Sequence, residues 1–195
     1  MRLKDIATIK TGLVLSRKKA ARYDVQKKYQ KITLKSFSNS TQINPNSLDE
    51  FVSNSEVKQE YLTQTNDIII RLRAPNIALY VDKNAQGLVI SSLMSVIRLN
   101  DKNINSRFLA YYLNSKQSQK IFNIAVKGTT IPMIRTGDIA ELDISLLPLS
   151  TQRKVIKTMD LLYKEQALLT ELTKKKQIFT QNILDTITKQ FQGEK

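Results

Sequence analysis

Two arginines at the end of an apolar run are the side chains best suited to recognising a nucleobase or a phosphate. Arg71 and Arg73 follow the run DIII at 67–70, and because Leu72 separates them, both point to one side of an extended chain. An arginine guanidinium donates two parallel hydrogen bonds to guanine O6 and N7 or to a phosphate group. We therefore interpret this pair as the first candidate for base recognition. The alternative is that both arginines form ion pairs with nearby acidic side chains.

Basic residues are concentrated in the first 36 positions. The formal net charge is +14, and residues 1–36 contain 11 Lys or Arg against 2 Asp or Glu. A positive field of this size attracts polyanions, among which nucleic acid is the commonest partner, although a basic surface also simply keeps a protein in solution. Three further residues are expected to contact phosphates: Lys18, Lys19 and Arg22. A short basic loop is expected to contact phosphates or base edges through Lys127, Thr129 and Thr130.

Catalytic groups are scarce in this sequence. It has no Cys and no His, which excludes thiolate nucleophiles, the usual zinc ligands and His-based acid–base catalysis. Its five glycines form no G-x-G phosphate loop, and no D/N-P-P-Y/F tetrapeptide of amino-methyltransferases occurs. Asp138, Glu141 and Asp143 could surround a divalent metal in a nuclease, but they fit solvated residues beside a strand better. We expect neither catalysis, nor a metal, nor a cofactor in this chain.

Membrane and export signals are also missing from the sequence. No apolar stretch approaches the roughly 20 residues that a membrane-spanning helix requires. The opening MRLKDIATIKTG lacks the apolar run of a signal peptide. We expect a cytoplasmic protein without membrane contact, and its 41% apolar residues are enough for a packed core.

Short apolar runs separated by turn formers predict a mixed α+β domain that holds the candidate side chains. The opening 3–9 is typical of a short helix or turn, and 38–50 is typical of an exposed loop. Ser106 is a suitable N-cap for a helix from 107 to about 122. The predicted strands are 29–34, 67–70, 77–81, 88–99 and 139–146.

The last quarter of the chain predicts one long helix. Between Pro148 and Gly193 there is no Pro and no Gly, and apolar residues recur at spacings of three, four and seven. Such a helix would reach roughly 60 Å, longer than a domain of this size can bury, so we expect it to pair antiparallel with another copy. Gln166 and Lys176 interrupt the seam, and the alternative is that the helix packs back onto its own domain. The interface candidates are Leu162, Leu169, Leu172, Phe179 and Ile183.

Four stretches of the sequence together carry a resemblance. They are LKDIATIKTG, YLTQTNDIIIRLRAPNIALYVDKNAQGLVISSLMSVIRL, SRFLAYYLNS and VKGTTIPMIRTGDIAELDISLLPLSTQRKVIKTMDLLYKEQALLTELTKKK. In this order they resemble a target-recognition domain followed by the helical region of the specificity subunit of type I restriction-modification systems. Full-length members carry two such domains and two helical regions in tandem, whereas this chain has one of each and looks like a half subunit.

The resemblance implies a non-catalytic DNA reader with a target-recognition domain at 1–148 and a helical spacer and dimerisation region at 149–195. Such a domain enters the major groove of double-stranded DNA, and the helices set the distance between two half-sites. Methyltransferase subunits that bring S-adenosylmethionine and methylate adenine N6 dock on this scaffold, and a restriction subunit that uses ATP and Mg²⁺ can join. The resemblance therefore implies that these cofactors bind the partner subunits and not this chain.

A single small recognition domain reads too few bases to act alone. Each bidentate contact discriminates by about 1–3 kcal/mol, and a few such contacts do not single out one site in a genome. A homodimer formed through the long helix would read two inverted half-sites separated by untouched DNA. The competing hypotheses are a stand-alone repressor or decoy that does not support modification, and the nuclease built on the three acidic residues.

Overall fold

The chain forms two compact units, Met1–Ile156 and Lys157–Lys195. The structure is a computed structural model that describes residues 1–21, 27–37, 41–126 and 132–193. Within these ranges, no helix is both long enough and apolar enough to cross a membrane. The mixed α+β class and the long C-terminal helix are as predicted, whereas the pairing of that helix with another copy stays a prediction.

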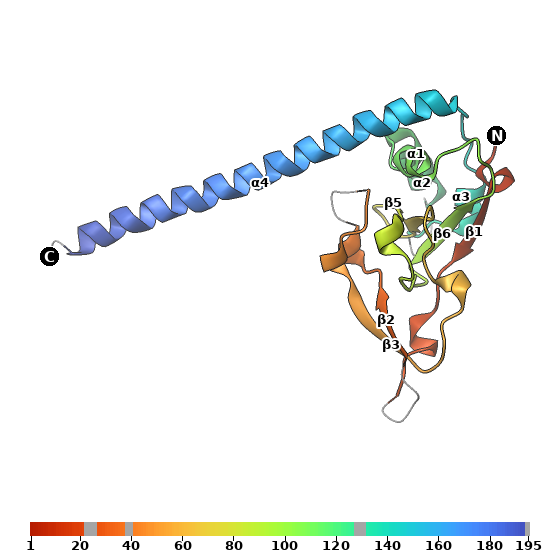
Figure 1. Cartoon of the computed structure of the whole chain (residues 1–195), viewed down its shortest axis with the longest axis horizontal. Helices are drawn as coiled ribbons and strands as arrows, with labels where there is room; N and C mark the ends of the chain where they lie inside the picture. The colour runs from red at the N-terminus through yellow and green to blue at the C-terminus, as the bar shows by residue number, and fades with distance from the viewer. Residues whose placement is uncertain (22–26, 38–40, 127–131, 194–195) are drawn as a thin grey trace. The chain divides into compact units, whose positions relative to one another are not determined.

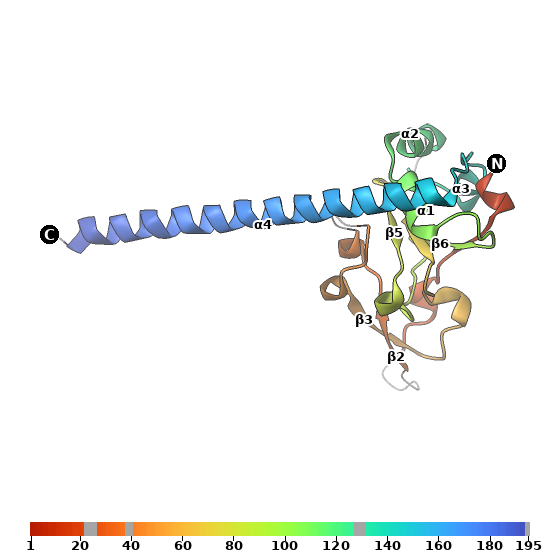
Figure 2. The ribbon, with the colours of Figure 1, turned by 45° about the horizontal axis from the view of Figure 1, so that its top comes forward.

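The first unit is built on a four-stranded antiparallel sheet in the order β1-β6-β4-β5. The strands are β1 (Ala7–Thr11), β4 (Ile68–Arg71), β5 (Ala78–Tyr80) and β6 (Met94–Leu99), and they lie side by side in Figures 1 and 2. The central position of β4 explains its apolar sequence, because a strand buried on both faces has no polar side to alternate with. Ile68, Ile69 and Ile70 are accordingly 0% exposed.

The two faces of this sheet pack against different partners. Ile68 and Ile70 face the helices α1 (Ser106–Leu113), α2 (Lys116–Ala125) and α3 (Thr136–Ala140). Ile69 points the other way, because side chains alternate along a strand, and it joins a cluster with Ile32 and Phe37. The sheet therefore separates a helical layer from a layer of loops and short strands.

That second layer contains a two-stranded antiparallel sheet, β2 (Lys27–Lys31) and β3 (Asp49–Ser53). Tyr29 and Phe51 are directly paired, and both pack into a small apolar cluster around Val89. Single turns of 3-10 helix connect the strands of the unit; they are η1 (Leu3–Asp5), η2 (Leu15–Arg17), η3 (Leu34–Ser36), η4 (Pro45–Ser47), η5 (Gln59–Tyr61) and η6 (Lys83–Ala85).

The long helix α4 (Leu149–Gly193) begins directly after Pro148, as the sequence predicts. Gln152 is 0% exposed and holds the first turns: its Oε1 accepts a bond of 2.8 Å from the Asn105 amide. Its Nε2 donates at 2.8 Å to the carbonyl groups of Asn103 and Leu147. Val155 and Ile156 also pack against the helix-covered core, so the start of α4 belongs to the first unit.

Several predicted elements are correct in place but not in extent. The strand at 67–70 is confirmed and the one at 77–81 is β5, but the predicted strand 88–99 is regular only from Met94. The predicted helix 107–122 is interrupted, because the Asn114 side chain leaves the helix to bond both the amide and the carbonyl of Ala78, at 2.8 Å each. Asn105, not Ser106, caps α1 with its side-chain oxygen.

One predicted element is wrong, and another is right only at its start. The opening segment continues past its short helical turn into β1, and the predicted strand 139–146 is replaced by α3 and an extended segment. The backbone of this segment pairs with the N-terminus, since the Leu3 amide bonds the Leu142 carbonyl at 3.0 Å and the Ile144 amide bonds the Met1 carbonyl at 2.8 Å. β1 forms by pairing with β6 and the extended segment by pairing with the N-terminus, and contacts between segments this far apart leave no local pattern.

Candidate nucleic-acid interface

A cationic edge forms where the segment around Lys19 runs beside β3. Lys19 bridges Ser53, and the Ala20 amide bonds the Val52 carbonyl at 3.0 Å. Ser53 pairs on its other side with Lys27 of β2, so the backbone register places Lys19 and Lys27 on either side of one strand. Both lysines are exposed. The segment around Lys19 and strand β2 thus both pair with β3, and this pairing concentrates positive charge there.

Within the described residues, the cations of this region fall into two classes. Arg17, Lys19, Lys27 and Lys35 are exposed and make no ion pair with a described acid, so they are available to an external anion. Lys10, Lys28 and Lys31 are paired with Glu60 at 3.0 Å, Glu50 at 3.9 Å and Asp49 at 3.7 Å. The hydrogen bond and charge of Lys10 lower the pKa of Glu60, which keeps that carboxylate ionised.

Of the predicted phosphate-binding residues, Lys18 and Lys19 lie on this edge. The Lys18 side chain is half-buried and its Nζ donates to Ser55 Oγ at 2.8 Å, which fixes it more tightly than Lys19. Arg22, Lys127, Thr129 and Thr130 lie outside the described residues, so their roles stay predictions.

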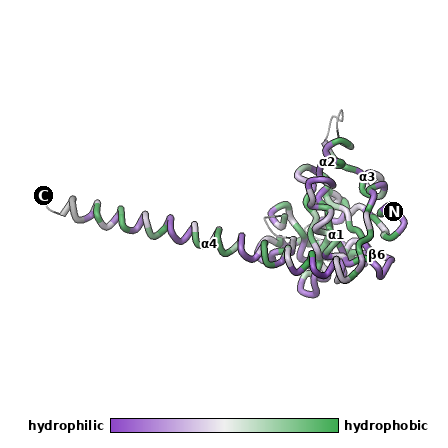
Figure 3. Tube along the Cα trace, turned by 90° about the horizontal axis from the view of Figure 1, so that it is seen from above, coloured by the Kyte–Doolittle hydropathy of each residue, from purple (hydrophilic) through white to green (hydrophobic). Residues whose placement is uncertain are grey.

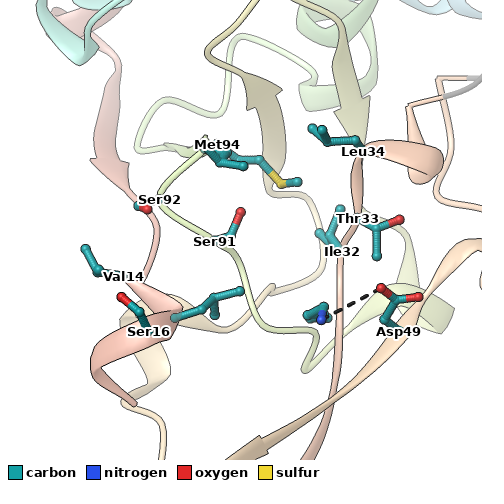
Figure 4. Close-up of a pocket in the computed structure, with 12 residues that line it drawn as sticks. Val14, Ser16, Ile32, Thr33, Leu34, Asp49, Ser91, Ser92 and Met94 are labelled. Carbon is teal, nitrogen blue, oxygen red and sulfur yellow. Dashed lines mark ion pairs between the residues drawn. The ribbon is translucent and has the colours of Figure 1, made fainter. Parts of the chain in front are cut away.

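A pocket of about 330 Å³ opens at the other end of the β2–β3 pair from the cationic edge, where Lys31 and Asp49 contribute to its lining. Figure 4 places Val14 and Ser16 on one side and Ile32 and Thr33 on the other, with Ser91 between them. The dashed line in that view is the ion pair between Lys31 and Asp49, 3.7 Å long. Three large apolar side chains on the lining are unusually exposed; they are Val14 (40%), Leu34 (46%) and Leu93 (39%).

Gly12 allows a close backbone approach beside Ser91, which lines the pocket. A Cβ at Gly12 would overlap the backbone carbonyl groups of Ile90 and Ser91, so only glycine lets the two segments approach. The Leu13 amide then bonds the Ile90 carbonyl at 2.7 Å, and the Ser92 amide bonds the Leu13 carbonyl at 2.8 Å. The pocket wall is therefore a rigid backbone pairing and not a loose loop.

The pocket combines the chemistry that distinguishes bases. Exposed apolar side chains accept the thymine methyl group, and hydroxyl groups bond to donors or acceptors on base edges. Cations that neighbour the lining in sequence, Arg17 and Lys35, suit the phosphates on either side. The arrangement can thus hold a base edge between two phosphate contacts.

As predicted, Arg71 is the last residue of β4 and Arg73 follows the strand, but the two side chains differ in burial. Arg71 is half-buried, lies opposite Met94, and its Nε is buried without a hydrogen-bond partner. Met94 lines the pocket, so Arg71 lies beside the pocket wall. Arg73 is exposed and bridges Met133. Neither arginine pairs with an acid among the described residues, which leaves base recognition untested but removes the ion-pair alternative within those ranges.

An ion pair between a half-buried guanidinium and a buried carboxylate links β6 to the residue before β4. Arg98 Nε lies 3.0 Å from Asp67 Oδ1, and one terminal nitrogen donates to Oδ2 at 3.2 Å and to the Leu62 carbonyl at 2.7 Å. Burial raises the pKa of Asp67, and the hydrogen bond from Arg98 opposes that rise. The pair is structural, because Asp67 is only 2% exposed.

The three acids considered for a nuclease have separate structural partners. Asp138 accepts the Arg135 amide at 2.7 Å and so caps α3, and Glu141 forms ion pairs with Arg2 and Lys4. These lysine and arginine contacts lower the pKa of Glu141. Asp143 takes part in a backbone bridge to Arg2. Among the described residues, no three acidic side chains are grouped to hold a metal ion.

The predicted interface residues of α4 are all exposed in the single chain. Leu162, Leu169, Leu172, Phe179 and Ile183 are 51%, 57%, 50%, 66% and 44% exposed. Figure 3 shows apolar and polar residues alternating along the helix. A row of large apolar side chains left in water is typical of a surface that another helix covers.

The fold can now be compared with known proteins. A family model described as "Type I restriction modification DNA specificity domain" matches residues 1–179. The chain belongs to this family. The match covers both the sheet with its cationic edge and most of α4. No curated protein matches this specificity domain by sequence.

Solved structures share the fold of this specificity domain. The HsdS subunit from Thermoanaerobacter tengcongensis has a TM-score of 0.66 at 18% identity, over 95% of this chain and 47% of that one. A chain solved to explain complex assembly and conformational transition of the type I R-M system has a TM-score of 0.59 at 17% identity, over 87% and 39%. The S subunit from M. genitalium gives 0.51 at 16%, over 89% and 42%. The chain therefore spans less than half the length of each.

Sequence reasoning missed three parts of the candidate surface of this specificity domain. The pocket, the unpaired Lys27 and Lys35, and the close approach at Gly12 depend on pairing between segments distant in the sequence. One feature of the sequence could have indicated this surface: Leu34, at the end of a predicted strand, stands between the polar residues Thr33 and Lys35. In the structure Leu34 is exposed, and an exposed large apolar side chain is typical of a contact surface.

Proposed function

We propose that this chain is the DNA-recognition subunit of a type I restriction-modification system and that it has no catalytic activity of its own. The observation that carries the proposal is a pocket lined by apolar and hydroxyl side chains, with the unpaired cations Arg17 and Lys35 next to its lining in the sequence, on a chain of the specificity family. Cations without an intramolecular partner bind phosphates, and the pocket supplies groups that differ in affinity for the four base pairs.

In this function the surface has two parts. Lys18, Lys19 and Arg22, together with Lys27 and Lys35, neutralise backbone phosphates and fix the register of the domain on the duplex. Arg71, Arg73 and the pocket lining contact base edges in the major groove, with Lys127, Thr129 and Thr130 as further contacts to bases or phosphates.

Two copies of the chain act together in this proposal. Their α4 helices pair antiparallel, and each copy presents one recognition domain to one half of an inverted, two-part target. The exposed apolar row on α4 supports the pairing, because its members remain in water in the single chain.

Catalysis is assigned to partner subunits. Methyltransferase subunits bind S-adenosylmethionine and modify adenine, and a restriction subunit uses ATP and Mg²⁺, all on a scaffold that this chain provides. The absence of a G-x-G loop from the sequence supports this division. The complex would act on cytoplasmic DNA.

The experiment that tests the surface is selection from a random double-stranded DNA library with the full chain, followed by sequencing and binding measurements at several salt concentrations. Changing Lys18 and Lys19 together to Ala should weaken binding to all sequences alike and reduce the salt slope by about 1 for each phosphate that is no longer neutralised. A change of Lys83→Ala, an exposed lysine on η6, is the matched control and should leave both the affinity and the salt slope unchanged.

Arginine variants distinguish base recognition from phosphate contact in the same selection. Arg71→Ala and Arg73→Ala should broaden the selected base pattern, because a bidentate contact to a base supplies about 1–3 kcal/mol of discrimination. An equal fall in affinity on every sequence would make both residues phosphate contacts. Enrichment of no sequence by the wild-type chain, with and without a type I methyltransferase subunit, would contradict the proposed function.

A further inference from the structure

Two charged residues occupy the apolar seam of α4. The positions 162, 165, 169, 172, 176, 179 and 183 alternate in steps of three and four, which is the pattern of a coiled-coil seam. Five of them are the exposed apolar residues named above, and the other two are Glu165 and Lys176. At 100° per residue these two point within about 20° of one another around the helix axis.

Neither charge is satisfied within the chain. Among the described residues, Glu165 and Lys176 make no ion pair, although Glu171 and Lys175 of the same helix are paired at 2.7 Å. A single charged residue on a coiled-coil seam weakens pairing unless a partner charge meets it, and for that reason it selects one register over others.

Parallel pairing does not meet this requirement. In a parallel, in-register pair each seam residue faces its own copy, so Glu165 would face Glu165 and Lys176 would face Lys176. Like charges in contact at a partly dehydrated seam are destabilising. The distribution of charge therefore favours the antiparallel direction.

Only one antiparallel register pairs the two charges. If the two-fold axis passes between Thr170 and Glu171, every Glu165 faces the partner's Lys176. The same register places Leu169 opposite Leu172 and Leu162 opposite Phe179, so apolar residues meet apolar residues on both sides of the ion pairs. All of these are contacts between the two alternating seam positions, as antiparallel coiled coils require.

Registers shifted by one heptad do not preserve this match. Shifting in one direction puts Glu165 opposite Leu169, and shifting in the other puts it opposite Ile183. Lys176 then faces Thr158 or Leu172. Each shift leaves four charges per dimer without partners against apolar or neutral groups, which is costly.

We propose that two copies of this chain pair through α4 in a single antiparallel register, fixed by two ion pairs between Glu165 and the partner's Lys176. This rests on the proposed function only in that the chain works as a pair. The two-fold axis then lies about 30 Å along the helix from Leu149 at 1.5 Å per residue, so the register defines how long a spacer each copy contributes.

Cysteine cross-linking tests the register directly, because the chain contains no Cys. A mixture of Glu165→Cys chains and Lys176→Cys chains should form a disulfide-linked dimer under mild oxidation, and the second Glu165–Lys176 ion pair stays intact in it. Each variant alone should not cross-link, since its two cysteines would be about 16 Å apart along the seam.

Two control mixtures report the competing registers. Glu165→Cys chains mixed with Leu169→Cys or with Ile183→Cys chains cross-link only if the helices are shifted by one heptad. A preference for either control mixture, or self-linking of Glu165→Cys chains as in a parallel pair, would overturn the proposal. So would the absence of any cross-link in all of these mixtures.

Charge reversal supplies an independent readout. Glu165→Lys and Lys176→Glu should each weaken the dimer about tenfold or more in sedimentation measurements, and the double variant should return to within about threefold of wild type. Glu171→Lys, outside the seam, is the control and should change the dimer dissociation constant less than about threefold.

The register and the proposed function can fail separately. If the double variant does not recover while wild-type dimers still select a two-part DNA target, the register is wrong and the function stands. If the register is confirmed but no DNA sequence is selected, the function fails and the pairing stands.

Discussion

The two units of this chain treat the same kinds of side chain in opposite ways. In Met1–Ile156, Leu109, Ile68 and Phe122 are 0% exposed. In Lys157–Lys195, Leu169 and Phe179 are 57% and 66% exposed. Burying one such side chain stabilises a structure by about 1.5–3 kcal/mol. The first unit gains this stabilisation from its own core, whereas the large apolar side chains of the second unit remain exposed in the single chain.

Charged residues follow the same division. In the first unit, Asp67 and Arg98 are enclosed and matched by several hydrogen bonds, and they serve the fold. On the helix, Glu165 and Lys176 are exposed and have no ion-pair partner among the described residues. The difference shows that contacts within the chain satisfy the charges of the first unit, and it supports the proposal that contacts between chains satisfy those of the second.

The largest effect expected from this comparison separates two phenylalanines. Phe122→Ala should lower the free energy of unfolding of the first unit by about 4 kcal/mol, because it empties a fully buried site on α2. Phe179→Ala should change that free energy by less than about 0.5 kcal/mol and should instead weaken the dimer. Chemical denaturation and sedimentation measure the two quantities. Equal effects of both variants on unfolding would contradict the division.

The next effect concerns the buried ion pair. Arg98→Leu leaves the buried Asp67 carboxylate without its main partner. The change should therefore lower the free energy of unfolding by about 3 kcal/mol at neutral pH. Burial already raises the pKa of Asp67, and the Arg98→Leu change removes the influence that opposes the rise. Lys175→Ala, which removes an exposed pair on α4, is the matched change and should cost less than about 0.5 kcal/mol.

The stability of the Arg98→Leu variant relative to wild type should depend on pH in a defined direction. A carboxyl whose pKa is higher in the folded state than in the unfolded state takes up its proton first in the folded state, so this group raises stability as the pH falls through that pKa. The loss in free energy of unfolding relative to wild type should therefore become smaller as the pH falls from neutral into the ordinary range of carboxyl pKa values. Adding Asp67→Asn should remove the pH dependence of the difference, and an unchanged deficit across this range would exclude the mechanism.

The smallest of these effects lies at the start of α4. Gln152→Ala leaves the Asn105 amide and the carbonyl groups of Asn103 and Leu147 without their partner, which should cost about 2 kcal/mol in thermal or chemical unfolding. Gln166→Ala, on the exposed part of α4, should cost less than about 0.5 kcal/mol. If both glutamines proved equally dispensable, the first turns of α4 would not be fastened to the first unit.

The sequence predicts best the features that repeat locally. The apolar run at 67–70 and the uninterrupted pattern after Pro148 each contain their own signal, and both predict the elements that the structure has there, β4 and α4. The break at Asn114, the pairing of Leu3 with Leu142 and the approach at Gly12 depend on residues far away in the chain. The pocket is formed by four segments, at 14–16, 31–34, 49 and 91–94, and no periodicity in any one of them reveals it.

The central claim is that two copies of this chain read one two-part DNA target. The most direct test is to co-express the chain with a type I methyltransferase subunit and to map N6-methyladenine across the host genome. We predict a motif of two inverted half-sites separated by a constant unspecified spacer, which Glu165→Lys abolishes and the Glu165→Lys, Lys176→Glu double variant restores. A stable complex that adds no methylation, as a decoy would form, or a motif with one half-site only, would contradict the account.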